Sequence, residues 1–319
     1  MEIGQDQAVM IDAHGVAVTD FDGNDVPEPV VYEIDWDASA AEKGGWDSFM
    51  DKEIHEEPAA VQRTLIGRLD DEGRLNLDEV HIDEHDFKAV DKIIVIGCGT
   101  ASYAGMVAKY AIEHWVRIPV EVELAHEFRY RDPILTPRTL VVAISQSGET
   151  MDTLMALRHA REQGSKVLAI CNTQGASIPR ESDAVLYTHA GPEVAVASTK
   201  AFVAQITAAY VLGLYLAQLK GTVFRDEIAQ TLDSLKDMPR KIQWVLDTQP
   251  SKVAAAARQL RDANSFLFLG RHVGYPVALE GALKLKEIAY TFTEGFAAGE
   301  LKHGPIALVD EGEPVVFIV

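Results

Sequence analysis

Between residues 91 and 221 the sequence alternates short apolar runs with helix-like segments, and this alternation constrains the fold most. The runs KIIVIG, PVEVEL, TLVVAIS, KVLAIC and AVLYT are mostly Val, Ile, Leu and Ala. Strands of this kind are buried on both faces, as in a parallel sheet covered by helices. We therefore expect an α/β fold with a doubly wound parallel sheet, whose ligand would bind beyond the carboxyl ends of the strands.

Helical patterns separate these runs at residues 101–115, near Glu127, and at residues 149–163 and 198–219. The last of them contains Gln205 and Thr207 and falls short of the roughly 20 apolar residues that a membrane span needs. Nothing after Met1 resembles a signal peptide. We predict a cytoplasmic protein without a membrane partner.

The formal net charge of −20 argues against nucleic acid or an anionic membrane surface as the main partner. An anionic substrate would need a local site of oriented amides and hydroxyls. The two cysteines, Cys98 and Cys171, have no metal-binding spacing, and each follows or ends an apolar run. We predict that both are small buried side chains and that the chain uses neither a metal nor a cofactor.

A second domain of the same kind begins later. The stretch SFLFLGRHVGYPVALEGALKLKEI echoes KIIVIGCGTASYAGMVAKYAIE, and the corresponding Gly97 and Gly270 are 173 residues apart. The final run PVVFIV would match LVVAIS, so the second copy would end in mid-sheet. Before the first copy, AVMID, VAVTDF and VVYEID predict three short strands, which are too few for a stable domain. Residues 45–69 look helical, with Pro58 dividing two segments.

The stretch ISQSGET suggests a phosphate site, because small polar residues follow a buried strand and precede a helix. Ser145, Ser147 and Thr150 offer hydroxyls, and Gly148 lets the backbone approach closely. The alternative is that Ser147 or a neighbour simply caps the helix. Two further hydroxyl-bearing helix starts, GCGT and VASTK, would lie on the same sheet edge and favour a phosphorylated small molecule. The sequence contains neither GxxxxGK[ST] nor GxGxxG, so a nucleotide is not indicated.

A candidate acid–base group lies in LEGALKLKEIAY, where Glu280, Lys284 and Glu287 have the spacing of one helix face. From spacing alone, a solvated salt-bridged face is the preferred interpretation. His303 lies in the Gly/Pro loop ELKHGP, where a single histidine is usually structural or exposed.

Five motifs in order, ISQSGET, LAICN, VASTKAF, ALEGALKLKEI and AGELKHGP, resemble the isomerase half of the glutamine–fructose-6-phosphate aminotransferases, also called glucosamine-6-phosphate synthases. That half is a pair of SIS (sugar isomerase) domains. The resemblance covers essentially the whole chain, since ASAAEKGGWDSFMDKEIHEEP resembles the linker that follows the family's glutaminase domain. It implies a remnant of the glutaminase domain at 1–36, a helical linker at 37–90, a first SIS domain at 91–222, connecting helices at 223–264 and an incomplete second SIS domain at 265–319.

The resemblance also implies roles for individual residues. Fructose 6-phosphate or glucosamine 6-phosphate would contact Thr100, Ser145, Gln146, Ser147, Thr150, Val196, Ala197 and Ser198. Glu287 would transfer the proton and His303, supplied by the neighbouring subunit of a homodimer, would open the sugar ring, with Glu280 and Lys284 as supporting groups. Many members carry a hydroxyl where this sequence has Ala101, so one contact would be missing.

Two functions follow from the resemblance. The first is the sugar-phosphate isomerase portion of the aminotransferase, which converts fructose 6-phosphate and glutamine to glucosamine 6-phosphate and glutamate. The second is a sugar-phosphate-binding SIS module without catalysis. Glu287 and His303 favour the first, whereas the expected absence of the glutaminase nucleophile and the C-terminal tail favours the second.

Overall fold

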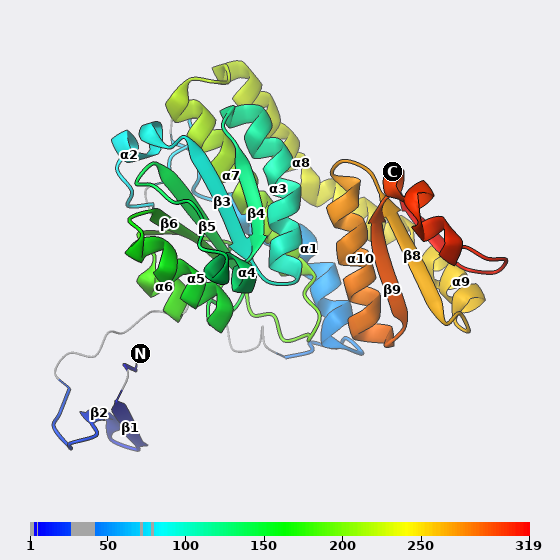
Figure 1. Cartoon of the computed structure of the whole chain (residues 1–319). Coiled ribbons are helices and arrows are strands. Elements are labelled where there is room, and N and C mark those ends of the chain that lie inside the picture. Colours follow the sequence, from blue (N-terminus) through cyan, green and yellow to red (C-terminus); the bar gives the residue numbers. More distant parts are fainter. Residues whose placement is uncertain (1–2, 5, 27–41, 71–72, 78–79) are drawn as a thin grey trace. The chain divides into compact units, whose positions relative to one another are not determined.

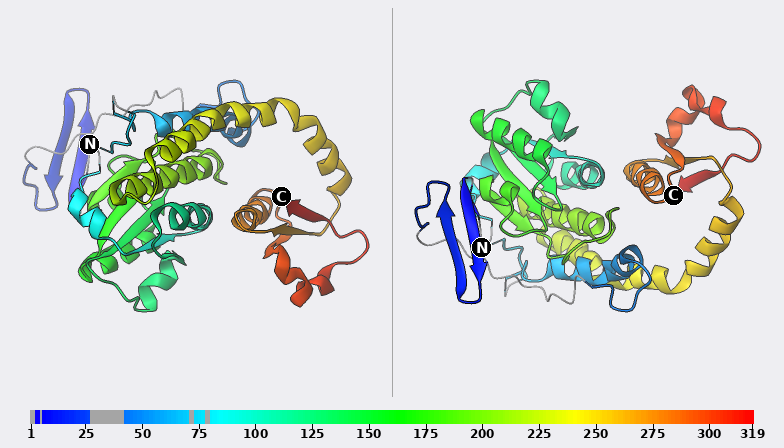
Figure 2. Two further views of the ribbon diagram at one scale, coloured as in Figure 1. Left: turned by 90° about the horizontal axis from the view of Figure 1, so that it is seen from above. Right: turned by 90° about the horizontal axis from the view of Figure 1, so that it is seen from below.

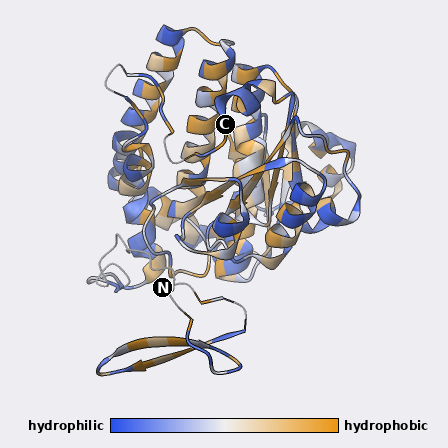
Figure 3. Ribbon diagram, turned by 90° about the vertical axis from the view of Figure 1, so that its left-hand side faces the viewer, coloured by the Kyte–Doolittle hydropathy of each residue, from blue (hydrophilic) through white to orange (hydrophobic). Residues whose placement is uncertain are grey.

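The computed structural model of the chain describes residues 3–4, 6–26, 42–70, 73–77 and 80–319, which separate into two compact units, Met1–Asp37 and Ala38–Val319. The small unit contains an antiparallel hairpin of β1 (Gln7–Asp12) and β2 (Gly15–Asp20). Oδ1 of Asp12 closes its turn by accepting hydrogen bonds from the backbone N–H groups of His14 and Gly15. The hairpin is largely hydrophobic (Figure 3), yet Met10 is 66% exposed. The third predicted strand, VVYEID, lies outside the described residues.

The large unit contains a five-stranded parallel sheet in the order β4-β3-β5-β6-β7 (Figure 1). This confirms the predicted α/β fold, and each of the five apolar runs forms one strand. The strands are β3 (Lys92–Gly97), β4 (Val120–Leu124), β5 (Thr139–Ser145), β6 (Lys166–Cys171) and β7 (Ala184–Tyr187).

Helices cover both faces of this sheet: α3 (Thr100–Val116), α4 (Ala125–Tyr130), α5 (Met151–Glu162), α6 (Ser177–Glu181) and α7 (Lys200–Lys220). In β3, Ile93 and Val95 belong to the core cluster that contains residues of α3 and α7. The alternate residues Ile94 and Ile96 belong to the cluster that contains residues of α4 and α5. The strand is therefore buried on both sides, which explains its unbroken apolar sequence.

Helix α7 has 21 residues and is long and apolar enough, by length and composition, to cross a membrane. Its bounds are close to the predicted 198–219, but its length and composition meet the membrane-span requirement that we expected it to miss. However, 61% of its most apolar window is buried inside the structure, where it packs against α1 (Phe49–Leu65) and α3. This packing is that of a core helix.

The prediction that Pro58 divides two helical segments is wrong, because α1 runs through Pro58 from Phe49 to Leu65. Proline removes one backbone donor from a helix, but burial of the following turn holds this one together. Val61 and Thr64 are buried, and the Thr64 hydroxyl donates a hydrogen bond to the backbone oxygen of Thr188 at 2.6 Å.

Two further helices, α8 (Arg225–Thr248) and α9 (Pro250–Leu260), lead to a second sheet (Figure 2). Its parallel strand order β10-β8-β9 repeats the order β5-β3-β4 of the first sheet, and α10 follows β8 as α3 follows β3. This is the arrangement expected of an internal repeat. The remaining elements are α2 (Glu84–Ala89), β8 (Ser265–Gly270), α10 (Gly274–Ala289), β9 (Phe292–Ala297), η2 (Ala298–His303), η3 (Pro305–Leu308) and β10 (Val315–Ile318).

Candidate functional site

The loop between β5 and α5 is organised by its own hydroxyl groups. Oγ of Ser145 accepts a hydrogen bond from the backbone N–H of Gly148 at 3.0 Å and shares one with Oγ1 of Thr150 at 3.2 Å. Oγ of Ser147 accepts from the N–H of Glu149 at 3.2 Å. These contacts fix the loop so that its polar groups surround the start of α5.

Gly148 is required by both conformation and space. Its φ of +71° lies in the left-handed region that L-residues with side chains rarely adopt. A Cβ atom there would lie 2.6 Å from Cβ of Ala176 and 2.9 Å from Sγ of Cys171. The loop can therefore pack this closely only with glycine.

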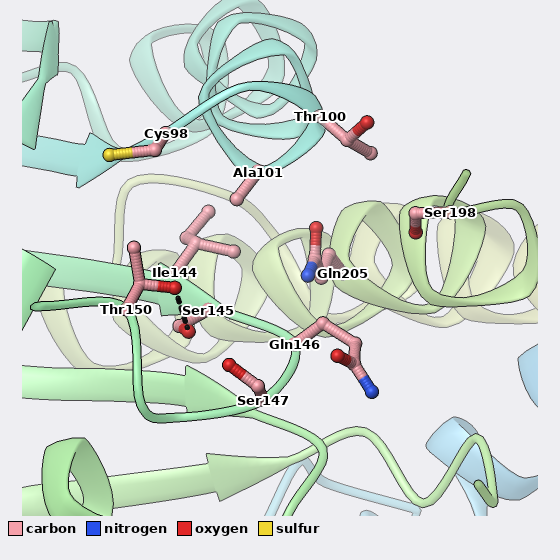
Figure 4. Close-up of a pocket in the computed structure, with 10 residues that line it drawn as sticks. All are labelled: Cys98, Thr100, Ala101, Ile144, Ser145, Gln146, Ser147, Thr150, Ser198 and Gln205. Carbon is pink, nitrogen blue, oxygen red and sulfur yellow. Dashed lines mark hydrogen bonds between the residues drawn. The ribbon is translucent and has the colours of Figure 1, made fainter. Parts of the chain in front are cut away.

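A cavity of about 150 Å³ opens in front of this loop (Figure 4). It is smaller than the roughly 300–1,000 Å³ of pockets that enclose drug-sized ligands, and suits a small polar group whose remainder extends outward. Its lining residues are Cys98, Thr100, Ala101, Ile144, Ser145, Gln146, Ser147, Thr150, Ser198 and Gln205.

Six of the eight predicted substrate contacts line this cavity: Thr100, Ser145, Gln146, Ser147, Thr150 and Ser198. The other two do not, since Val196 is 97% exposed and Ala197 is buried. The alternative that a side chain caps the helix is not what the structure has. Thr150 occupies the N-cap position of α5 and makes no side-chain capping hydrogen bond, so the N-terminal N–H groups of this helix have no such partner.

The start of α7 differs from the other two helix starts, because an internal carboxylate already occupies it. Oε1 of Glu193 accepts hydrogen bonds from Oγ of Ser198 and from the backbone N–H groups of Thr199 and Ala201 at 3.1–3.3 Å. Burial raises the pKa of Glu193, and these hydrogen bonds oppose the shift. These hydroxyl and N–H groups therefore already donate to Glu193 and are not free for a ligand.

The predicted acid–base residues on α10 form a hydrogen-bonded network that reaches the cavity. The Thr100 hydroxyl donates to Oε1 of Glu280 at 3.0 Å and accepts from Nζ of Lys284 at 3.1 Å. Nζ of Lys284 also donates to Oε2 of Glu287 at 2.6 Å. Thr100, which lines the cavity, thus joins it to the ionisable groups of α10.

A fully solvated face does not describe this network. Glu280 is only 5% exposed, and its Oε2 is buried with no hydrogen-bond partner among the described residues. Burial raises the pKa of Glu280, opposed by Lys284 and by the Thr100 hydrogen bond. The side chain of Glu287 is 34% exposed, so a ligand can reach it.

His303 lies at the end of η2 and is exposed. It is not among the residues that line the described cavity. Within one copy of the chain, the structure therefore does not bring His303 to the cavity in front of the loop between β5 and α5.

Sequence reasoning missed three residues that line the cavity, namely Cys98, Ile144 and Gln205. Gln205 is 2% exposed and points into the cavity (Figure 4), and its Oε1 has no hydrogen-bond partner among the described residues. The signal available was an amide side chain inside an otherwise apolar helix. Cys98 was predicted to be buried, but it is only half-buried because it borders the cavity; Cys171 is buried as predicted. Ala101 also lines the cavity, where a larger polar side chain would add a contact.

A sequence profile of the SIS domain matches residues 87–215 and 259–319, more than half of the chain. The chain belongs to the SIS domain family. The second matched segment contains α10, so the residues of the acid–base network lie within SIS-matched sequence.

Individual SIS relatives are more informative still. The glutamine–fructose-6-phosphate aminotransferase (isomerizing) of Corynebacterium glutamicum is 66% identical over 320 residues, covering 100% of this chain and 51% of that protein. The same enzyme of Streptomyces coelicolor is 64% identical over 320 residues, with 100% and 52% covered. The chain spans about half the length of the curated relatives it matches.

A solved structure agrees with these relatives. The C-terminal domain of glucosamine-fructose-6-phosphate aminotransferase from Francisella tularensis is 41% identical, with a TM-score of 0.83, over 88% of this chain and 78% of that one. The predicted resemblance to the isomerase half of these enzymes is confirmed.

Proposed function

We propose that this chain is the sugar-phosphate isomerase portion of a glutamine–fructose-6-phosphate aminotransferase, which makes glucosamine 6-phosphate and glutamate from fructose 6-phosphate and glutamine. The observation that carries the proposal is the double hydrogen bond of Thr100, which connects the hydroxyl-lined cavity to Glu280 and Lys284. A phosphate site alone would serve any phosphorylated ligand. A phosphate site joined to paired carboxylates and a lysine suits proton transfer on a sugar phosphate.

The phosphate would bind at the loop between β5 and α5. The uncapped start of α5 supplies oriented N–H groups and the positive end of the helix dipole. Ser147 and Thr150 supply hydroxyls, and Gln146 an amide. Such a site favours an anion locally despite the net charge of −20. Val196 and Ala197 stay in the proposal as sugar contacts because they adjoin Ser198, which lines the cavity.

The isomerisation would move a proton between C1 and C2 of the open-chain sugar. Glu287 is the proposed base, and Nζ of Lys284 holds its carboxylate in position by donating a hydrogen bond to Oε2 at 2.6 Å. Glu280 holds Thr100 and Lys284 in place. His303 is the proposed ring-opening group and, being exposed, is available to the cavity of a second copy in a homodimer. A cytoplasmic location and the predicted domain boundaries belong to the same proposal.

The second candidate is a SIS module that binds a sugar phosphate without converting it. The completed network of Thr100, Lys284 and Glu287 favours the enzyme, because a pure binder needs no such carboxylate beside its cavity. An assay of fructose 6-phosphate isomerisation, with and without Glu287→Gln, separates the two. Turnover that Glu287→Gln abolishes supports the enzyme, whereas saturable binding without turnover in either protein supports the binding module.

Binding itself is tested by calorimetric titration of the purified chain with fructose 6-phosphate, with inorganic phosphate at equal ionic strength as the reference ligand. Ser147→Glu places a carboxylate in the cavity and should abolish binding of both ligands by charge repulsion. Ser234→Glu, on the exposed face of α8, adds the same charge elsewhere and should leave binding unchanged. Unchanged affinity in Ser147→Glu would move the phosphate away from this loop.

A further inference from the structure

A group of potential metal ligands lies beside the cavity and outside the acid–base network. Ligand atoms of Cys98, His126 and Asp152 all lie within 4.8 Å of one another. The three residues come from three different segments around the first sheet. Cys98 follows β3, His126 is in the first turn of α4, and Asp152 is in the first turn of α5.

The donor set is that of a borderline divalent cation. Zinc binds thiolate, imidazole and carboxylate at about 2.0–2.3 Å, so neighbouring ligand atoms in a tetrahedral site lie about 3.3–3.8 Å apart. The ligand atoms, now at most 4.8 Å apart, reach that spacing if side-chain rotations move them by about 1 Å. The side chain of His126 is 43% exposed and Asp152 is exposed, so both can rotate.

The surroundings of the three residues suit this role. Sγ of Cys98 lies 3.8 Å from Oγ1 of Thr153, a weak contact that a metal–sulfur bond can replace. The Glu127 carboxylate lies 3.7 Å from Nε2 of His126, and carboxylates beside a metal-bound histidine commonly support it. Cys171 offers no comparable ligand, because burial raises the pKa of its thiol to about 12.

We propose that Cys98, His126 and Asp152 bind one zinc-type divalent cation, with solvent in the fourth position. On binding, the Cys98 thiol releases its proton to solvent as the sulfur–metal bond forms, so the cluster gains one net positive charge. Because Cys98 also lines the cavity, that charge lies at the cavity wall. No local sequence pattern indicates this site, since His126 and Asp152 follow Cys98 by 28 and 54 positions.

The test is a titration of the tag-free, metal-stripped chain with Co²⁺, followed by competition with Zn²⁺. Cobalt bound by a thiolate gives a sulfur-to-metal charge-transfer band in the near-ultraviolet. We expect one equivalent to bind with this band, and Zn²⁺ to displace it. Mg²⁺, which prefers oxygen ligands, should not compete. No sugar phosphate is present, so the outcome is independent of the proposed isomerase function.

Variants assign the ligands. Cys98→Ser should lose the charge-transfer band, and His126→Asn or Asp152→Asn should weaken Co²⁺ binding by about tenfold or more. The matched controls are His114→Asn on α3 and Glu162→Gln on α5, both exposed, and these should bind like the parent chain. Cys171→Ala is the thiol control, and its folding is verified by circular dichroism.

Three results would overturn the proposal. One is a folded parent chain that gives no cobalt–thiolate band, and another is a band that survives in Cys98→Ser. The third is a Co²⁺ affinity that is the same in His126→Asn and Asp152→Asn as in their controls.

Discussion

The hydroxyl of Thr100 donates a hydrogen bond to Oε1 of Glu280 across 180 residues of sequence, at 3.0 Å. Thr100 begins α3 of the first sheet's layer, whereas Glu280 lies on α10 of the second. Because α10 packs against α3, the two copies of the repeat meet where the cavity and the acid–base residues join. The side chain of Thr100 thus links the proposed phosphate site to the residues proposed for proton transfer.

Removing that hydroxyl should cost stability. Thr100→Val keeps the shape of the side chain but leaves the buried Oε1 of Glu280 without this donor, which should lower the free energy of unfolding by about 1–3 kcal/mol. Urea denaturation measures the change. Thr207→Val is the control, because its hydroxyl donates to the Val203 carbonyl of its own helix and such bonds contribute little. Equal losses in the two variants would contradict a special role for Thr100.

Gly148→Ala should destabilise the chain by about 2–4 kcal/mol, because it combines a left-handed φ with overpacking against Ala176 and Cys171. Thermal or urea unfolding measures the loss. Gly164→Ala separates the two causes, since Gly164 has a φ of +85° but nothing within 4 Å of an added Cβ. That control should lose only about 1 kcal/mol. If both variants lose the same free energy of unfolding, the close packing around Gly148 does not contribute to the loss.

Gln205 and Gln218 lie on the same helix, and the same substitution should affect them in opposite ways. Oε1 of Gln205 has no hydrogen-bond partner among the described residues, so Gln205→Leu should be neutral or stabilising. Gln218 accepts from the N–H of Leu75 at 3.0 Å and donates to its carbonyl at 2.8 Å. Gln218→Leu leaves both groups unpaired and should cost about 2–3 kcal/mol.

Gln205→Leu also tests whether Gln205 contacts a ligand in the cavity. Gln205→Leu should weaken fructose 6-phosphate binding by about tenfold, the effect of one lost hydrogen bond, because a sugar hydroxyl can satisfy the buried Oε1. Inorganic phosphate, which carries no sugar hydroxyl, should lose less. Calorimetric titration of both ligands gives the comparison. A destabilised Gln205→Leu with unchanged fructose 6-phosphate affinity would place this amide in the core alone.

The sequence predicted all five strands of the first sheet, together with β8 and β10 of the second, because buried parallel strands have a strongly apolar composition, as in the run that contains Ile93 and Val95. It did not predict β9, whose sequence FTEGFA is not an apolar run. It also predicted Ser145, Ser147 and Thr150 at the cavity, since residues that follow a strand directly must lie at the sheet edge. Both features depend only on residues that are neighbours in the sequence, so they can be predicted from the sequence alone.

What the sequence could not predict depends on contacts between distant segments. Nothing near Pro58 indicates that burial against α7 keeps α1 continuous. Nothing near Glu193 indicates that its carboxylate folds back onto the start of α7. The link between Thr100 and Glu280 likewise depends on how α10 packs against α3, which no local pattern encodes.

Two half-buried carboxylates beside the start of α7, Glu57 and Glu193, make stability depend on pH. Burial and the neighbouring Glu193 raise the pKa of Glu57 from its ordinary 4.5 to about 7, opposed by His55. Between these values the folded state holds a proton that the unfolded state has lost. The free energy of unfolding should therefore be highest at low pH and fall as pH rises through 7.

Glu57→Gln replaces this titrating carboxyl group with a neutral amide and should flatten the dependence of the free energy of unfolding on pH. From about pH 5 to pH 8 the variant should gain on the order of 2–3 kcal/mol relative to the parent chain, measured by urea denaturation. Glu162→Gln, exposed on α5, reports the general effect of removing one negative charge from an acidic protein and should track the parent. If Glu57→Gln follows the same pH profile as Glu162→Gln, Glu57 is ionised at neutral pH in the folded chain. The carboxylates around α7 would then be stabilised by cations such as Lys200, whose Nζ lies 2.6 Å from Oε2 of Glu56, rather than by a retained proton.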